Sequence, residues 1–274
     1  MIVNKAEVVI GRVILIIVLV LTLVPLVNML SAALQPADTN PTGLTFPTDP
    51  QWINFVTAFE TGNVWRLMGS SIFIVIFVVP ISLLLATLAG YALGNLRMRG
   101  GRFLFIFLIL GLTIPFEALI IPLYYQMQAL GVLNTQWAVI LPLIGLYMPF
   151  SVVWMRAHFI GVPPELSEAA RVDGATTFQE FRQIQLPLAR PALSALAILL
   201  FLWTWNQFLL PVVLISDPLD RTVAGALTFF QGQYSSSIPL LNAGALIIIV
   251  PTIVVFVIFQ RQFIKALLQG AVKG

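Results

Sequence analysis

The sequence predicts an all-α polytopic membrane protein with six transmembrane helices and cytoplasmic N and C termini. Hydrophobic residues make up 59% of the 274 residues and charged residues only 9%, whereas soluble domains carry about 25% charged residues. Six long apolar runs reach the length of about 20 residues that a helix needs to cross the bilayer core. Lysine and arginine gather in alternate segments between these runs, which is typical of cytoplasmic loops.

The six apolar runs are the expected transmembrane helices, and they extend over residues 13–34, 70–93, 103–124, 138–158, 191–215 and 243–263. The first run follows two positive charges and ends in small residues, as a signal peptide does. Its apolar stretch is longer than the apolar region of a signal peptide, so we expect a retained helix.

The positive charges predict the orientation of the chain. Of the 14 lysine and arginine residues, only Arg66 and Arg221 fall in segments 35–69 and 216–242, which we therefore expect outside the cell. The others lie at the two ends and in two alternate loops: Lys5, Arg12, Arg97, Arg99, Arg102, Arg156, Arg171, Arg182, Arg190, Arg261, Lys265 and Lys273.

This orientation divides the chain into three expected parts. Residues 1–69 form the first transmembrane helix and an extracytoplasmic segment, and residues 70–263 form a core of five transmembrane helices. The core contains a cytoplasmic loop at residues 159–190, and residues 264–274 form a cytoplasmic tail.

The residue inventory argues against several kinds of chemistry. The chain has no cysteine and a single histidine, His158, which alone cannot build a zinc site. No phosphate-binding loop ending in Gly-Lys is present, because none of the three lysines follows a glycine. We therefore expect no catalytic residues and no metal site in this chain, and if ATP powers it, another chain binds the ATP.

The loop at residues 159–190 carries more sequence signals for ordered structure than any other segment between the apolar runs. Pro163 and Pro164 suit the start of a helix, and Glu165 and Glu168 complement the positive end of its dipole. Gly174 can adopt the left-handed conformation that ends helices. These residues predict one short helix.

A second short helix is expected after Gly174. Thr177 and Glu180 have the spacing of a capping box. Pro187 cannot donate a hydrogen bond inside a helix, so we expect this helix to end or bend there, before the fifth run begins near Pro191.

The first short helix has two readings. Ala169 and Ala170 present almost no side chain and would allow close approach of another protein, with apolar and anionic side chains at Leu166, Val172, Glu168 and Asp173. The alternative is an amphipathic hairpin that lies on the membrane surface. Residue chemistry alone does not choose between these readings.

The stretch EAARVDGATTFQEFRQIQLPLARP resembles the EAA loop of binding-protein-dependent ABC importer permeases. The matching positions are Glu168, Ala169 and Ala170, then Asp173, Gly174 and Ala175, then Ile184, Leu186 and Pro187. The stretches AGYALGNLRMRGGR, GVLNT, WTWNQF and LLQGAVKG are similar to the carbohydrate-uptake branch, in particular to its maltose-type, MalG-like permease subunits. The resemblance covers nearly the whole chain, although Gly94-Asn95 stands where the branch commonly has Ala-Arg.

The resemblance implies a type I ABC importer permease fold and a non-catalytic subunit in the cell membrane of a bacterium or archaeon. The implied partners are a second homologous, MalF-like permease subunit, two ATPase subunits that hold ATP and Mg, and an extracytoplasmic binding protein that delivers carbohydrate. No nucleic acid partner is expected. The implied ATPase-coupling residues are Glu165, Leu166, Glu168, Ala169, Ala170, Asp173, Gly174 and Ala175.

The substrate path is less clearly marked. Trp205, Asn206 and Gln207 offer an aromatic face and hydrogen-bonding groups in an apolar run, which suits a neutral sugar. Alternatively, Asn206 forms a hydrogen bond to a neighbouring helix. Glu117 lies 14 residues beyond Phe103, about 21 Å along the third helix, and either faces a cavity or is a structural carboxyl group. It stands between Pro115 and Pro122, which leave backbone carbonyls free and can bend this helix.

Two rival functions remain at this point, a channel or ion-coupled carrier without an ATPase and a membrane-embedded enzyme. The sequence does not choose among a disaccharide or oligosaccharide, an amino sugar, a polyol and a glycerol-phosphate derivative.

Overall fold

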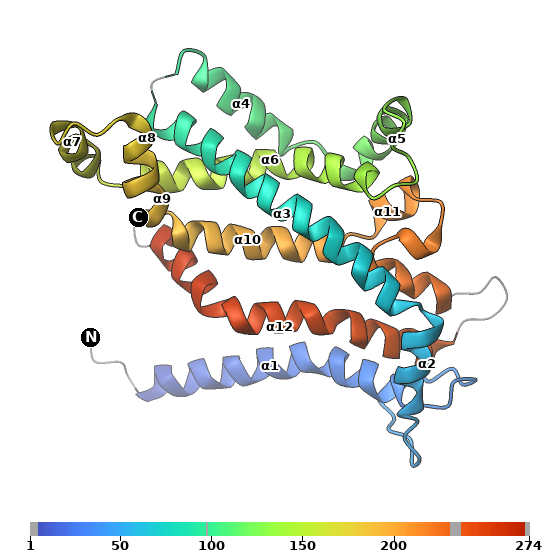
Figure 1. The fold of residues 1–274 in the computed structure, drawn as a ribbon. Coiled ribbons are helices and arrows are strands. Elements are labelled where there is room, and N and C mark those ends of the chain that lie inside the picture. Colours follow the sequence, from blue (N-terminus) through green and yellow to red (C-terminus); the bar gives the residue numbers. More distant parts are fainter. Residues whose placement is uncertain (1–4, 97, 231–236, 272–274) are drawn as a thin grey trace. The chain divides into compact units, whose positions relative to one another are not determined.

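The structure of the chain, a computed structural model, describes residues 5–96, 98–230 and 237–271, with side chains from residue 8 to residue 261 within these ranges. The predicted cytoplasmic charges at Lys5, Arg97, Lys265 and Lys273 lie outside the described side chains. Every described element is helical (Figure 1). In chain order they are α1 (Lys5–Ala33), α2 (Ile53–Thr61), α3 (Val64–Asn95), α4 (Gly101–Gly111), η1 (Phe116–Leu119), α5 (Ile120–Ala129), α6 (Trp137–Ile160), α7 (Pro164–Val172), α8 (Thr177–Glu180), η2 (Phe181–Gln185), α9 (Leu186–Leu188), α10 (Arg190–Trp205), α11 (Leu209–Leu214), η3 (Pro218–Asp220), η4 (Val223–Phe230) and α12 (Ile238–Ala271).

Four of the described helices, α1, α3, α6 and α12, are long and apolar enough to cross a membrane. The number rises to six if each of two bent helix pairs forms one span. The prediction of an all-α polytopic membrane protein is confirmed. The count of six holds only in this second sense, in which α4 pairs with the segment Phe116–Ala129 and the segment Thr177–Leu188 pairs with α10. The second pair thus begins before the predicted run 191–215.

The third apolar run, in which we expected one helix over 103–124 that Pro115 and Pro122 can bend, is broken into separate helices. Helix α4 ends at Gly111, and the chain turns by 99° before η1 and α5. Pro115 explains the break, because it cannot donate to the helix ladder and holds the preceding residue away from helical geometry. Glu117 therefore does not lie 14 residues up one straight helix.

The fifth run, predicted over 191–215, is also interrupted. Helix α10 ends at Trp205, and α11 begins only at Leu209. Pro211 has no N–H to donate to the carbonyl of Gln207, four residues earlier. That carbonyl instead accepts a hydrogen bond from the Thr222 hydroxyl, over 2.6 Å.

The chain divides into two compact units, which we describe separately. The first contains the described residues of 1–65 and 226–250. Its core joins Ala33, Ala58, Phe230 and Ala243. The Asn54 amide nitrogen donates to the carbonyl oxygens of Ala33 at 2.8 Å and Gln35 at 2.7 Å, which fixes the chain that follows α1.

The second unit contains residues 66–225 and the described part of 251–274. Within it, α6 packs against both α4 and α10 (Figure 1). Helices α3 and α6 approach closely at Gly90, where an added Cβ would lie 2.6 Å from Met155 Cβ and 2.9 Å from the Arg156 backbone nitrogen. Glycine is required there because no side chain fits between the two helices.

Candidate functional site

The predicted cytoplasmic loop at residues 159–190 folds as a helical hairpin. We call residues 163–188 of it the α7–α9 hairpin. Helix α7 begins with Pro164 and carries Glu165 in its first turn, as predicted. Gly174 has φ +79° and donates its N–H to Arg171 O at 3.1 Å, while the Ala175 N–H reaches Ala170 O at 2.9 Å. The prediction that the first helix stops at Gly174 is confirmed.

The capping box of the second helix lies one residue earlier than we predicted. Thr176 is the N-cap, with extended backbone, and its hydroxyl accepts from the Gln179 N–H at 3.3 Å. The Gln179 side-chain oxygen accepts from the Thr176 N–H at 2.7 Å. The assignment to Thr177 and Glu180 was wrong because Thr177 is already helical and Glu180 is turned into the protein.

The carboxylate of Glu180 has a structural role within the hairpin. Its side chain is 4% exposed, and its Oε2 lies 3.7 Å from Nε of Arg171, on α7. A buried carboxylate needs a charged or hydrogen-bonding partner. This contact therefore links α7 to α8.

The hairpin continues through a π-helical turn, η2, in which the Leu186 N–H reaches the Phe181 carbonyl. Gln185 is fully buried in this turn, and its Nε2 donates to the hydroxyl of Ser167 on α7, over 3.0 Å. The segment Thr177–Leu188 then meets α10 at an angle of 68°. The prediction of an end or bend near Pro187 is confirmed.

One face of α7 is open to solvent. Val172 is 88% exposed, and Leu166, Glu165, Glu168 and Ala169 are exposed with it. Among the described residues, the carboxylates of Glu165, Glu168 and Asp173 form no ion pair. The face is thus apolar in its centre and anionic along its length.

Ala170 does not belong to this open face. It is 6% exposed and packs inside the hairpin, and Ala175 is half-buried beside it. The expectation that both alanines present a flat surface is therefore correct only for Ala169. Phe178, in the first turn of α8, is 68% exposed and was missed. Its sequence signal was an aromatic side chain among polar neighbours in a predicted cytoplasmic loop.

The predicted substrate-path residues are separated by the break after α10. Trp205 is 3% exposed, and its ring stacks on Phe201 with centroids 5.6 Å apart. Asn206 is exposed, and its amide nitrogen donates to Leu202 O in the same helix at 2.8 Å. Gln207 is half-buried, and Glu117 is exposed in the η1 turn.

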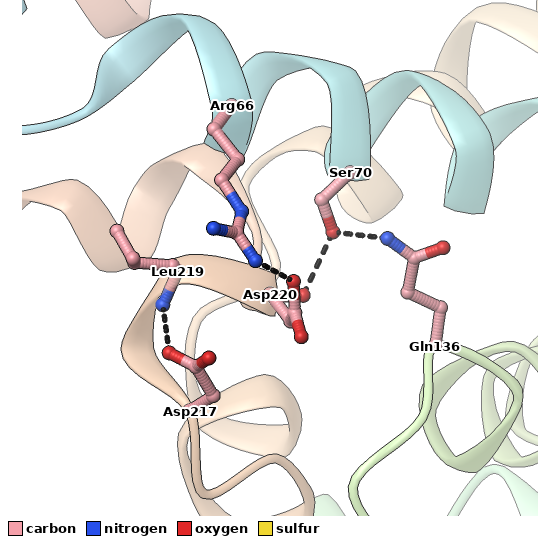
Figure 2. Close-up of polar contacts among 6 residues, drawn as sticks. All are labelled: Arg66, Ser70, Gln136, Asp217, Leu219 and Asp220. Atoms are coloured by element: carbon pink, nitrogen blue, oxygen red, sulfur yellow. Dashed lines mark hydrogen bonds and ion pairs between the residues drawn. The ribbon is translucent and has the colours of Figure 1, made fainter.

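A second polar arrangement, which we call the α3–η3 network, was not predicted (Figure 2). Arg66 pairs with Asp220 at 2.9 Å, and the Ser70 hydroxyl donates to the Asp220 carbonyl at 2.8 Å. Gln136, just before α6, donates to Ser70 Oγ at 2.8 Å, and Asp217 caps η3 through the Leu219 N–H. The network joins α3, α6 and η3. The isolated arginine in the segment 35–69 was the sequence signal for it.

No group of three or more potential metal-ligating side chains occurs among the described residues.

The model of the family described as binding-protein-dependent transport system inner membrane component matches residues 86–268. The chain is 39% identical to an arabinooligosaccharides transport system permease protein of Halalkalibacterium halodurans over 255 residues, covering 91% of each chain. It is 33% identical to a trehalose transport system permease protein of Mycobacterium tuberculosis, covering 92% of this chain and 93% of that relative. It is 32% identical to a diacetylchitobiose uptake system permease protein of Streptomyces coelicolor, covering 82% and 76%.

Solved structures show the same fold. A chain of a bacterial ABC transporter involved in the import of the acidic polysaccharide alginate matches with a TM-score of 0.79 and 22% identity, covering 96% of this chain and 99% of that chain. The alginate transporter in complex with alginate pentasaccharide-bound periplasmic protein matches with a TM-score of 0.67 and 17% identity, covering 93% and 95%.

The resemblance carried by the EAA-like stretch is thereby confirmed, and so is the prediction that the chain is not an enzyme, since its relatives are permease subunits. The chain belongs to the family of inner membrane components of binding-protein-dependent transport systems and has the fold of an ABC importer permease.

Proposed function

We propose that this chain is one of two permease subunits of an ATP-driven importer that moves a carbohydrate into the cytoplasm. The observation that carries the proposal is full-length similarity to permease proteins named for arabinooligosaccharides and trehalose. The partners in this proposal are a homologous permease subunit, two ATPase subunits that bind ATP and Mg, and an extracytoplasmic binding protein.

The α7–α9 hairpin is the proposed contact with the ATPase. A coupling element must be a stiff body that transmits a displacement to the membrane helices. The hairpin meets this need because it is closed internally by the Arg171–Glu180 and Ser167–Gln185 contacts and runs into α10 across one bend. The exposed residues Glu165, Leu166, Glu168 and Ala169 would contact the partner, while Gly174 and Ala170 shape the turn.

The proposed orientation puts this hairpin and both termini in the cytoplasm. Arginines in and beside the hairpin, such as Arg171, Arg182 and Arg190, support it through the preference of Lys and Arg for cytoplasmic loops. The segments 35–69 and 216–242 would then lie outside. In this proposal, the first span and its outer segment are residues 1–69. The permease core is residues 70–263, and the cytoplasmic tail is residues 264–274.

The break between α10 and α11 is the proposed point of contact with substrate in this subunit. Interrupted helices are tolerated in membranes where they line a cavity or pack in protein. Asn206 and Gln207 lie in the break, and Trp205 supports it from the buried side. Glu117 would lie near the substrate route at the second break, between α4 and α5.

Reconstitution of the chain with its genomic neighbours in vesicles tests the proposal. We expect ATP hydrolysis to rise when the binding protein is added with its cognate sugar, and that sugar to accumulate inside. Arabinooligosaccharides, trehalose, diacetylchitobiose, a polyol and glycerol phosphate form a suitable panel. Solute flux from a chain that assembles with no ATPase would overturn the proposal and favour a channel or carrier.

A further inference from the structure

A cavity of about 570 Å³ opens beside the C-terminal ends of α3 and α6, and α6 leads from there into the α7–α9 hairpin. Helix α4 forms its other wall. The lining residues are Leu93, Leu96, Met98, Gly101, Arg102, Phe105, Ile106, Ile109 and Arg156. We call it the α3–α4 cavity, and no predicted site residue lies in it.

Two guanidinium groups line this cavity. Arg156 is half-buried, donates through Nε to Leu93 O at 3.2 Å, and lies 3.9 Å above the ring of Phe105. Arg102 is exposed at the start of α4. Neither arginine forms an ion pair with a carboxylate of the described residues. The side chain of Arg156 is thus held in place, while its charge has no carboxylate partner in the described part of the chain.

The rest of the lining is apolar. Leu93, Phe105, Ile106 and Ile109 line the cavity along α3 and α4. Helix α4 has no buried residue, and Phe103 and Phe107 are 78% and 63% exposed on it. Exposed apolar side chains along a helix are typical of a surface that faces lipid. The cavity therefore combines an apolar wall with a cationic lining at the end of the spanning helices.

We propose that the α3–α4 cavity binds an anionic glycerophospholipid from the leaflet on the hairpin side of the membrane. The lipid phosphate would contact Arg102 and Arg156, and an acyl chain would lie against Ile106 and Ile109. Basic pockets between helices at the cytoplasmic side of a membrane have the charge and position that anionic headgroups need. A free phosphate shares the headgroup chemistry but has nothing to place against the apolar wall.

The site does not depend on which solute is transported, so its test uses lipid binding rather than uptake. The complex is purified in detergent with its partner subunits, delipidated, and titrated with phosphatidylglycerol, phosphatidylcholine or inorganic phosphate. Bound lipid is counted by native mass spectrometry. We expect phosphatidylglycerol to bind more tightly than phosphatidylcholine, and millimolar phosphate not to displace it.

Two variants separate the charge from the apolar wall. Arg102→Gln should weaken phosphatidylglycerol binding about five-fold, the effect expected for one arginine near a lipid headgroup. Arg99→Gln is the matched control, because it removes the same charge three residues away and lies outside the cavity lining. Ile106→Trp leaves both arginines in place, but its larger side chain occupies the space proposed for the acyl chain. We expect this variant also to lose the preference for phosphatidylglycerol over phosphatidylcholine.

Several results would overturn the proposal. They are equal affinities of the wild type and Arg102→Gln, loss of binding in Arg99→Gln, or displacement of lipid by phosphate. Another is a photo-crosslinker at position 106 that captures a partner subunit instead of lipid, which would make the cavity a protein interface. Normal lipid binding in a complex that fails to transport any tested sugar would leave the lipid site intact and count only against the proposed function.

Discussion

The side chain of Gln185, fully buried in the π-helical turn η2, donates a hydrogen bond to the hydroxyl of Ser167 on α7 over 3.0 Å. This bond ties the front of the α7–α9 hairpin to the segment that continues into α10. Gln185 Oε1 has no partner among the described residues, so this buried amide depends on the bond through Nε2. A substitution at Ser167 removes this hydrogen bond and so tests whether the bond stiffens the hairpin.

Replacing Ser167 with Ala should loosen the hairpin. The buried amide nitrogen of Gln185 would lose its partner, at a cost of about 1–3 kcal/mol. We expect a lower ratio of sugar transported to ATP hydrolysed in the reconstituted complex. Thr177→Ala is the control, because Thr177 is exposed in the same hairpin. An unchanged ratio in Ser167→Ala, with normal assembly, would show that this bond carries no coupling.

Gly174→Val should separate ATP hydrolysis from transport. A left-handed backbone costs an L-residue about 1–2 kcal/mol, and φ is +79° at this position. A β-branched residue is the least suited to it. Gly174→Asn is the matched control, since asparagine tolerates this conformation. Equal transport by both variants in stably assembled complexes would contradict a need for the turn geometry.

Glu168→Lys should weaken co-purification of the ATPase subunits. The exposed Glu168 has no ion pair among the described residues, so its charge is available to a partner. The effect should shrink at high ionic strength, because salt screens exposed charges. Glu60→Lys makes the same charge change at an exposed position of α2 and should have no effect. Equal ATPase yield in the two variants would exclude a charge role.

Asn206→Ala should lower the rate of uptake at low sugar concentration. A hydrogen bond between Asn206 and the sugar would be worth about 0.5–1.5 kcal/mol, or about two- to ten-fold in apparent affinity. Asn242→Ala is a close control, because Asn242 donates to Ile238 O at 2.8 Å, the same bond to the fourth residue before it that Asn206 makes to Leu202 O. If both variants transport alike, Asn206 has a structural role only.

The α3–η3 network should depend more on Ser70 than on its ion pair. Arg66 and Asp220 are 55% and 45% exposed, and such exposed pairs contribute about 0–1 kcal/mol. Ser70→Ala removes a buried hydroxyl that bonds both Gln136 and Asp220. We expect Ser70→Ala to lower the Tm of the complex more than Arg66→Ala. The reverse order in a thermal melt would show that the ion pair dominates.

Local sequence signals predicted the elements that depend on neighbouring residues. Long apolar runs marked α1, α3, α6 and α12, because a helix that crosses lipid must be apolar along its whole length. Proline and glycine marked both ends of α7, since they act on the backbone of their own and adjacent residues. The one-residue error at Thr176 came from two threonines with equivalent spacing, where burial of Glu180 decided between them.

A bend near Pro115 was expected from the sequence, whereas the break before Pro211 was missed. Pro115 and Pro211 were visible, yet prolines also lie inside the continuous helices α3 and α6, at Pro80 and Pro142. A broken helix is tolerated in a membrane where another group of the protein satisfies the freed backbone carbonyl. At Gln207 that carbonyl is satisfied from outside the helix, by Thr222, which holds the broken form.

The sequence by itself determined that this chain is a helical membrane protein with a proline-bounded hairpin, because hydropathy and backbone chemistry act over short stretches. The permease family followed from the resemblance of the EAA-like stretch, which is also local. Only the tertiary structure decided which polar residues meet. Arg66 and Asp220 are 154 residues apart, Arg171 lies beside the buried carboxylate of Glu180, and Arg102 lines one cavity with Arg156. Such contacts depend on how helices pack across the fold, and no local pattern of residues specifies that packing.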